Sequence, residues 1–117
     1  MSESLNDHER IRKRKDFLEI FRRGRRYKGK YFNIVFLPNR LDHSRVAVVA
    51  GKKIGNAVTR NRIKRRMRAL FRRCKPDKDN SLDLILFPKK NAVRVPWNQL
   101  QQDYKLALKS ISQKTQL

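Results

Sequence analysis

Lysine and arginine side chains crowd the middle of this chain at spacings that suit phosphate binding. Between His43 and Pro76 there are twelve Lys or Arg residues and no Asp or Glu. A segment with so much charge of one sign repels itself unless it faces a polyanion. The planar guanidinium group of arginine can bond two phosphate oxygens at once. The pattern therefore predicts a surface that binds nucleic acid.

The candidate phosphate ligands lie on either side of a glycine. Lys52 and Lys53 precede Gly55, where we expect a tight turn or a close backbone approach. The other candidates lie on a predicted helix that begins near Asn56 or Thr59, either of which can cap it. The free N–H groups of such a helix start also favour anions. These helical candidates are Arg60, Asn61, Arg62, Lys64, Arg65 and Arg68.

Plainer interpretations exist for both groups. The helix could present a solvated basic face with no specific ligand, and Lys52 and Lys53 could lie on an ordinary surface loop. Long blocks of one charge rarely fold without a polyanion, which favours the phosphate-binding interpretation of the helix. Asn61 can donate and accept hydrogen bonds, so it either fixes the neighbouring arginines or reaches the ligand itself.

Composition limits the other classes of function. The chain has 117 residues, a net charge of +21 and 38% hydrophobic residues, which fits one nucleic-acid-binding domain over 1–117 with a modest core. No apolar stretch approaches the roughly 20 residues that span a bilayer, and the N-terminus lacks a secretory signal. The single cysteine, Cys74, fits a reducing cytosol. We therefore predict a cytoplasmic protein without a membrane partner.

Catalytic and metal chemistry find little support in the residues. His8, His43 and Cys74 form no metal-ligand cluster, so no metal site on the protein is predicted. Asp16 and Glu19 are interpreted as charges near a helix N-terminus rather than as an acid–base pair. Cys74 falls on an apolar helical stripe and is interpreted as core filler. No nucleophile–base constellation is visible.

Hydrophobic periodicity predicts the elements that position the basic residues. Helices are expected at about 15–23, from 56 or 59 to 73, and at 97–112, and strands at 31–37, 45–50 and 82–87. Gly24 is expected to stop the first helix, and residues 1–10 are expected to be disordered. The order α-β-β-α-β-α predicts an α+β fold, a two-layer sandwich with helices on a small mixed sheet.

The strand at 31–37 sends alternate side chains to opposite faces of the sheet. The odd-numbered residues from Tyr31 to Leu37 share one face, and the even-numbered residues from Phe32 to Phe36 share the other. One of the two sets must pack in the core. Aromatic residues at this spacing belong to a core more often than to a ligand platform.

The basic run and the residues upstream of it form a recognisable pattern. The run reads Lys52-Lys53-Ile54-Gly55-Asn56-Ala57-Val58 and then Arg60-Asn61-Arg62-Ile63-Lys64-Arg65. Upstream lies Arg12-Lys13-Arg14-Lys15-Asp16-Phe17, followed by Phe21 and Gly24. The pattern resembles the signature of the bacterial ribonuclease P protein family, over about 11–111. The family usually has a serine where this chain has Gly51, and often a glutamate after the basic run, where this chain continues with Met67-Arg68-Ala69.

The resemblance implies a subunit of ribonuclease P, the ribozyme that removes the 5′ leader of precursor tRNA. It implies that the partner RNA and its bound Mg²⁺ perform the hydrolysis and that no protein residue is catalytic. The implied partners are one catalytic RNA per protein and precursor tRNA, with no obligatory protein partner. It also implies a left-handed β–α–β crossover, in a fold like the second domain of ribosomal protein S5, although right-handed crossovers are the general rule.

The resemblance further implies a cleft between the first helix and the sheet that holds single-stranded leader. Aromatic side chains stack on unpaired bases, and basic neighbours bind phosphates. The candidates for this cleft are Lys13, Lys15, Phe17, Phe21, Arg25 and Phe32. Two other classes stay open: a basic ribosomal protein embedded in ribosomal RNA, and a protein nuclease with its own active site, which the missing catalytic constellation disfavours.

Overall fold

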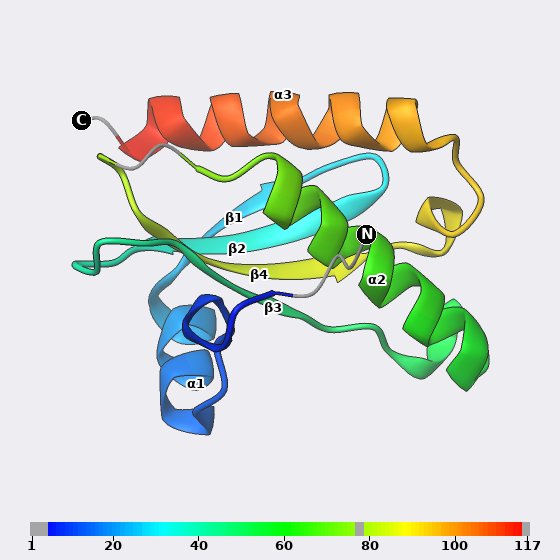
Figure 1. Cartoon of the computed structure of the whole chain (residues 1–117), viewed down its shortest axis with the longest axis horizontal. Coiled ribbons are helices and arrows are strands. Elements are labelled where there is room, and N and C mark those ends of the chain that lie inside the picture. Colours follow the sequence, from blue (N-terminus) through cyan, green and yellow to red (C-terminus); the bar gives the residue numbers. More distant parts are fainter. Residues whose placement is uncertain (1–4, 77–78, 116–117) are drawn as a thin grey trace.

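The apolar runs of the sequence form the two central strands of a four-stranded sheet (Figure 1). The structure is a computed structural model and describes residues 5–76 and 79–115. The helices are α1 (Arg14–Arg23), α2 (Ala57–Arg73) and α3 (Trp97–Thr115), and the strands are β1 (Arg25–Lys28), β2 (Phe32–Pro38), β3 (Arg45–Val48) and β4 (Leu82–Pro88). Three short 3₁₀ turns are η1 (Asp7–Glu9), η2 (Lys52–Ile54) and η3 (Lys90–Ala92).

The sheet has the strand order β1-β2-β4-β3 and mixes both pairing directions. β1 pairs with β2, and β2 with β4, in antiparallel fashion, whereas β3 and β4 are parallel. Parallel neighbours need a long crossover connection, which α2 supplies. The α+β class with a small mixed sheet is therefore confirmed.

The main core lies on the face of the sheet that α2 and α3 cover. Phe32, Ile34 and Phe36 of β2 point to this face and are almost completely buried. Phe32 contacts Tyr104 of α3, with ring centroids 5.9 Å apart. The even-numbered residues of β2 are thus the set that packs in the core.

The opposite face of the sheet carries a smaller cluster under α1. Ile20 of α1 packs there against Val35 and Ile85 from the two central strands. Figure 1 shows α1 below the sheet and α3 above it. Gly24 ends α1 at a close approach: a Cβ atom there would lie 2.7 Å from Val35 Cγ1 and 2.5 Å from the Ile20 carbonyl oxygen. The glycine is needed for packing, because its φ of −69° is open to any residue.

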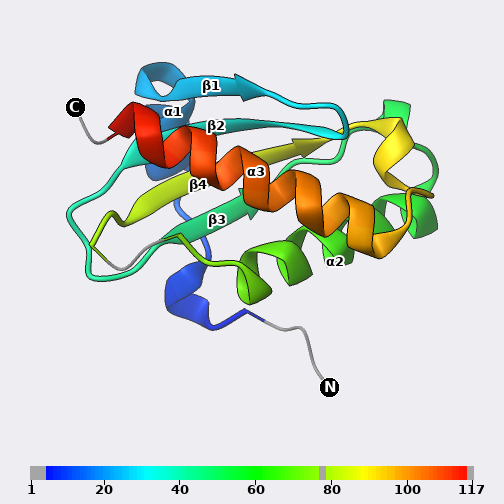
Figure 2. The same ribbon diagram turned by 90° about the horizontal axis from the view of Figure 1, so that it is seen from above.

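The connection from β3 through α2 to β4 is left-handed, which confirms the implied hand. Figure 2 shows β3 and β4 both running from left to right, with α2 returning on the same side of the sheet as α3. β4 lies above β3 in that view, and so to the left of β3 once the strands are turned to point upward. When the strands point upward and the connecting helix lies in front of the sheet, a next strand to the left means that the crossover is left-handed, which is the rare case.

Two expectations need correction. The first strand, β1, was not predicted, because Arg25–Lys28 shows no apolar alternation. The expected disorder over 1–10 is wrong for residues 5–10, and residues 1–4 lie outside the described residues. Leu5 is buried, and the backbone of Arg10 bridges to Val46 at the edge of β3.

An ion pair between a buried carboxylate and an exposed lysine holds this N-terminal segment in place. Glu9 is 2% exposed, and its carboxylate lies 2.5 Å from Lys75 Nζ. Burial by itself raises the pKa of Glu9, but the bonds from Lys75 and from the Asn6 backbone N–H outweigh it and hold the pKa below its usual value. The segment therefore packs as part of the fold rather than as a loose tail.

Core and surface phenylalanines should differ sharply in their effect on stability. Phe32→Ala removes a ring that is 1% exposed and should lower the free energy of unfolding by about 3–5 kcal/mol. Phe21→Ala removes a ring that is 40% exposed and should cost about 1 kcal/mol. Urea unfolding followed by circular dichroism measures both variants, and equal losses would contradict the assignment of Phe32 to the core.

Candidate nucleic-acid interface

A glycine and an asparagine fix the start of the basic helix. Gly55 has φ 148° and ψ −160°, a region that L side chains rarely adopt. The Asn56 side chain then caps α2, its Oδ1 accepting a hydrogen bond from the Thr59 backbone N–H at 2.9 Å. Asn56 is thus the cap, and the predicted tight turn at Gly55 is confirmed. Lys52 and Lys53 lie exposed in η2 just before this turn.

Helix α2 separates its apolar and basic side chains onto different faces. Ile63, Met67, Leu70 and Phe71 are completely buried against the sheet. Of the eight predicted phosphate ligands, five are exposed and three are half-buried. The exposed ones are Lys52, Lys53, Asn61, Arg62 and Arg65, and the half-buried ones are Arg60, Lys64 and Arg68.

These eight side chains are unpaired within the part of the chain that the structure describes. None of them forms a side-chain hydrogen bond or an ion pair with residues 5–76 or 79–115. The cations at the two ends of the basic run behave differently. Arg45 and Lys75 both pair with buried carboxylates, Asp83 and Glu9. The middle of the run is therefore left with uncompensated positive charge.

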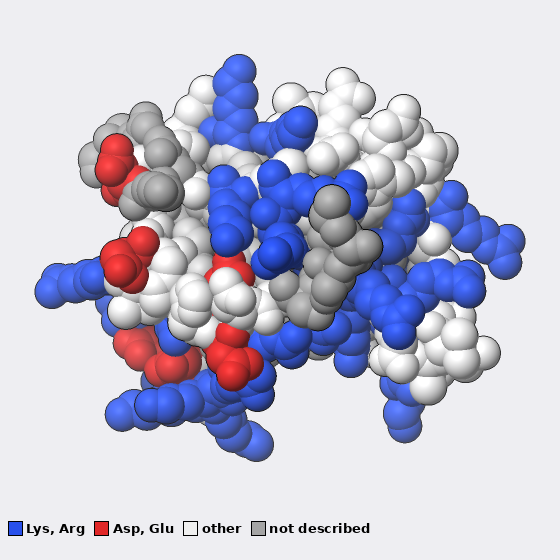
Figure 3. All heavy atoms as spheres, viewed as in Figure 1, with Lys and Arg blue, Asp and Glu red and all other residues white. Residues whose placement is uncertain are grey.

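Carboxylates form their ion pairs on other elements. Arg45 donates two hydrogen bonds to Asp83, at 2.9 and 2.8 Å, and this contact raises the pKa of Arg45. Asp16 also lies 3.4 Å from Arg45, and Glu19 pairs with Arg23 at 2.9 Å. In Figure 3 the acidic side chains are confined to the left half of the visible face, away from the N-terminal half of α2. Asp16 thus shares Arg45 with Asp83, and Glu19 pairs with Arg23, so each of the two carboxylates contacts an arginine.

Arg10 adds a cation beside α2 that the sequence analysis missed. It lines a hollow of about 210 Å³ together with Arg68 of α2 and Val46 of β3. Burial and the charge of Arg10 both lower the pKa of Arg68. In the described residues, the Arg10 Nε atom is buried without a hydrogen-bond partner. The apolar residues on either side, Leu5 and Ile11, were the available signal that this segment packs.

A second hollow lies between α1 and the sheet, on the face away from the main core. Its volume is about 290 Å³, and its lining includes Phe21, Arg26, Asn33 and Phe87. The rings of Phe21 and Phe87 meet edge to face at 6.2 Å, and the Arg26 guanidinium lies 4.7 Å from the centre of the Phe21 ring. Phe17 stacks on Phe21 with centroids 6.4 Å apart. Aromatic faces and cations are therefore combined in one groove.

The structure corrects two of the predicted cleft residues. Phe32 is wrong, because it points to the opposite face of the sheet and packs under α3. Arg25 is also wrong, because it shares that face and donates a hydrogen bond to the Lys114 carbonyl oxygen at 2.9 Å. Strand alternation places Arg26 in the groove instead, and Phe87 of β4 supplies the second aromatic wall.

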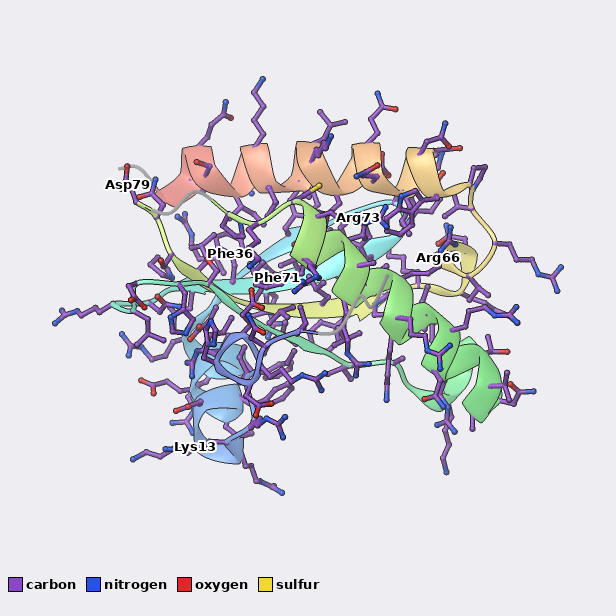
Figure 4. All side chains as sticks on the ribbon, viewed as in Figure 1. Lys13, Phe36, Arg66, Phe71, Arg73 and Asp79 are labelled. Carbon is purple, nitrogen blue, oxygen red and sulfur yellow. The ribbon has the colours of Figure 1, made fainter. Side chains whose placement is uncertain are left out.

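The other predicted cleft residues lie on α1 or at its start. Phe17 is half-buried and stacks on Phe21, but of the two rings only that of Phe21 lines the hollow. Lys13 and Lys15 are exposed near the N-terminal end of α1, and they do not line the hollow. Figure 4 shows Lys13 at the end of α1 that is remote from the sheet. Cys74 ends α2 and packs partly buried against the main core.

The described residues offer little support for metal binding or for a membrane-spanning helix. Within the described residues, no group of three or more His, Cys, Asp or Glu side chains could hold a metal ion. The same residues contain no helix that is long and apolar enough to cross a membrane.

Comparison with known sequences and structures decides the family. The sequence pattern of the family described as Ribonuclease P matches residues 5–112. The chain belongs to the ribonuclease P protein family. The ribonuclease P protein component of Thermotoga maritima is 41% identical over 90 residues, covering 77% of each chain. That of Syntrophus aciditrophicus is 46% identical over 88 residues, covering 75% of this chain and 74% of the relative.

Solved structures of ribonuclease P proteins share the fold. The Thermotoga maritima protein superposes with a TM-score of 0.77 at 34% identity, covering 87% of this chain and 96% of the other. The Staphylococcus aureus protein gives a TM-score of 0.75 at 30% identity, covering 88% and 94%. The segment before α1 is included in the match to the family pattern, in line with its packing here.

Two glycines of the turn before α2 should respond in opposite ways to alanine. Gly55→Ala puts a side chain at φ 148°, with its Cβ 3.1 Å from Thr59 Cγ2, and should cost about 1–3 kcal/mol. Gly51→Ala is the matched control, since its φ is −82° and its Cβ would meet no atom within 4 Å. It should be neutral or stabilise by about 0.4–1 kcal/mol. Thermal unfolding distinguishes them, and equal effects would refute the need for glycine at 55.

Proposed function

We propose that this chain is the RNA-binding protein subunit of ribonuclease P. In this proposal it binds the catalytic RNA and the 5′ leader of precursor tRNA and assists removal of the leader. The single observation that carries the proposal is the row of cations on and before α2, unpaired within the described residues, in a member of this family. The proposed complex contains one catalytic RNA per protein, needs no further protein, and acts in the cytoplasm.

The row of cations on α2 is the proposed contact with catalytic RNA. Arg62 and Arg65 are exposed and carry no internal ion pair in the described chain, so they can bind phosphates without first breaking a contact. Positive charge at this surface would also screen the repulsion between two RNA molecules. The hydrolysis itself is assigned to the RNA and to Mg²⁺ held chiefly by that RNA, with no catalytic residue on the protein.

The groove between α1 and the sheet is the proposed leader site. The partly exposed ring of Phe21 can stack on an unpaired base, and Arg26 and Lys28 can bind the phosphates of the same strand. Mature tRNA has no leader to place there. The groove would therefore favour substrate over product, and a difference of about 1.4 kcal/mol already changes relative affinity tenfold.

Reconstitution tests the proposed function directly. Purified protein is mixed with the catalytic RNA of ribonuclease P at low Mg²⁺, and cleavage of precursor tRNA is followed, with each component omitted in turn. We expect the mixture to cleave faster than RNA alone and the protein alone to be inactive. Cleavage by protein alone would reveal a protein nuclease, and no effect of the protein would favour the ribosomal alternative.

Phe21 should matter for the precursor but not for the mature tRNA. Phe21→Ala in the reconstituted complex should weaken binding of leader-bearing tRNA at least about fivefold, since one lost stacking contact is worth roughly 1–3 kcal/mol. Leu18→Ala is the matched control, because Leu18 is a similarly exposed apolar residue of α1, 43% against 40%, that does not line the groove. Equal losses for precursor and mature tRNA would exclude a leader site here.

A further inference from the structure

Arg66 lies in the middle of the basic helix but faces inward. Its Nη1 donates to the carbonyl oxygens of Ala92 and Val93 at 2.7 and 3.0 Å, and its Nη2 donates to that of Val95 at 2.6 Å. Burial lowers the pKa of Arg66. In the described residues its guanidinium contacts these carbonyl oxygens and lies 6.0 Å from the centre of the Trp97 ring. In Figure 4, Arg66 lies beside the η3 segment. The guanidinium fork therefore joins α2 to the loop before α3.

The loop that Arg66 holds carries cations of its own. Residues 89–96 link β4 to α3 and include Lys90 and Arg94, both exposed. The near end of the loop is fastened to the β1–β2 turn, where Lys89 Nζ donates to the Gly29 carbonyl oxygen at 2.6 Å. Its far half is held to α2 by the three carbonyl groups that Arg66 binds and by the side chains of Ala92 and Val95, which are buried in the main core. Arg66 therefore supplies the polar contact that fixes the backbone on either side of Arg94 relative to α2.

A hollow of about 560 Å³ lies between the loop and the start of α2. The cations in its lining come from both sides, Arg62 from α2 and Lys90 and Arg94 from the loop. Ile54 and Val93 supply apolar surface, and no carboxylate of the described residues lies in the lining. Three cations beside an apolar floor fit a phosphodiester together with the nucleoside attached to it.

We propose that this hollow is an RNA-binding subsite and that Arg66 is a positioning residue that assembles it. One phosphodiester of single-stranded or unpaired RNA would be bound by Arg62, Lys90 and Arg94, with its nucleoside on Ile54 and Val93. Arg66 does not bind the RNA: its donors face the loop carbonyls. The inference rests on the proposed function and adds a second strand-binding element to the α2 surface.

Substitution of the exposed loop cations tests the subsite. The Lys90→Ala and Arg94→Ala double variant should bind the catalytic RNA or the precursor at least about tenfold more weakly at low salt. The slope of log K against log salt should become shallower by the amount expected for the loss of about one to two phosphate contacts. Lys105→Ala and Lys109→Ala together are the matched control, since these exposed lysines of α3 do not line the hollow. An unchanged slope in the loop variant would overturn the subsite.

A double-mutant cycle tests the role of Arg66. Arg66→Gln should weaken RNA binding in the wild-type background and have little further effect when Lys90 and Arg94 are already alanine. Arg66→Lys keeps the charge but not the fork, so it should behave like Arg66→Gln. Arg65→Gln removes an exposed neighbour of Arg66. Its loss of binding free energy should add to that of the Lys90→Ala and Arg94→Ala double variant. Additive losses for Arg66, with rescue by lysine, would show a direct phosphate contact instead and overturn the positioning role.

Amide hydrogen exchange gives a readout that does not depend on RNA. In Arg66→Gln the amides of Ala92 and Val93, which are bonded within η3, should exchange faster, while amides of the central strands keep their protection. Uniform loss of protection would mean that Arg66→Gln unfolds the protein generally. In that case the Lys90→Ala and Arg94→Ala double variant, whose side chains are exposed, tests the subsite without it. Unchanged exchange in η3 would contradict the role of Arg66.

Three ligands locate the source of the bound phosphodiester. Loss of affinity for the catalytic RNA alone assigns it to that RNA, whereas a loss seen only with leader-bearing tRNA assigns it to the leader. Mature tRNA is the third arm, and a loss confined to it would contradict the proposal. If wild-type protein binds none of these RNAs, the proposed function fails as a whole. If wild-type binds and the loop variant binds equally well, only the subsite fails.

Discussion

The cations along α2 repel one another, and the rest of the structure must offset this repulsion for the helix to form. Like charges one helical turn apart destabilise a helix, and α2 carries no acidic residue to offset them. The opposing contribution is hydrophobic. Completely burying a side chain such as Ile63, Met67 or Leu70 contributes roughly 1.5–3 kcal/mol. The helix therefore persists because one of its faces belongs to the core, and the charged face is carried by it.

The few carboxylates in the chain are distributed so that this face stays basic. Asp83 and Glu9 are buried and pair with Arg45 and Lys75, the first and last cations of the central run. The first pair joins β3 to β4, and the second joins η1 to the segment that follows α2, so both contribute to the fold and neither involves the middle of α2. Arg66, another cation of this run, is stabilised by hydrogen bonds to backbone carbonyl groups and not by a carboxylate.

Much of the fold could be predicted from the sequence, because strong apolar periodicity marks each large element. The three helices and the strands β2, β3 and β4 lie where the pattern put them, within a few residues. β1 escaped because its residues are mostly charged and its pairing with β2 is a long-range property. Without β1, alternation could not be applied to its residues, and Arg25 was chosen where Arg26 faces the groove.

The candidate site was predictable in its helix and less so in its groove. The cations of α2 follow from a local period, which is why their exposure agrees with expectation. The groove depends on which face of the sheet each strand presents, and that is decided by packing with α1 and α3. Phe32 was misplaced for this reason, and Phe87 was overlooked. Arg10 and Arg66 look like ordinary members of basic runs, and only tertiary contacts distinguish them.

The uneven placement of acidic side chains makes the charge distribution of the free molecule asymmetric. One half of the visible face in Figure 3 carries charges of both signs, whereas the charged side chains seen in the other half, over the start of α2, are all basic. A polyanion at a distance of several ångströms therefore exerts a torque that turns α2 toward it before any contact forms. Added salt shortens the reach of this field, so the rate of encounter should fall with ionic strength even where the final contacts are unchanged.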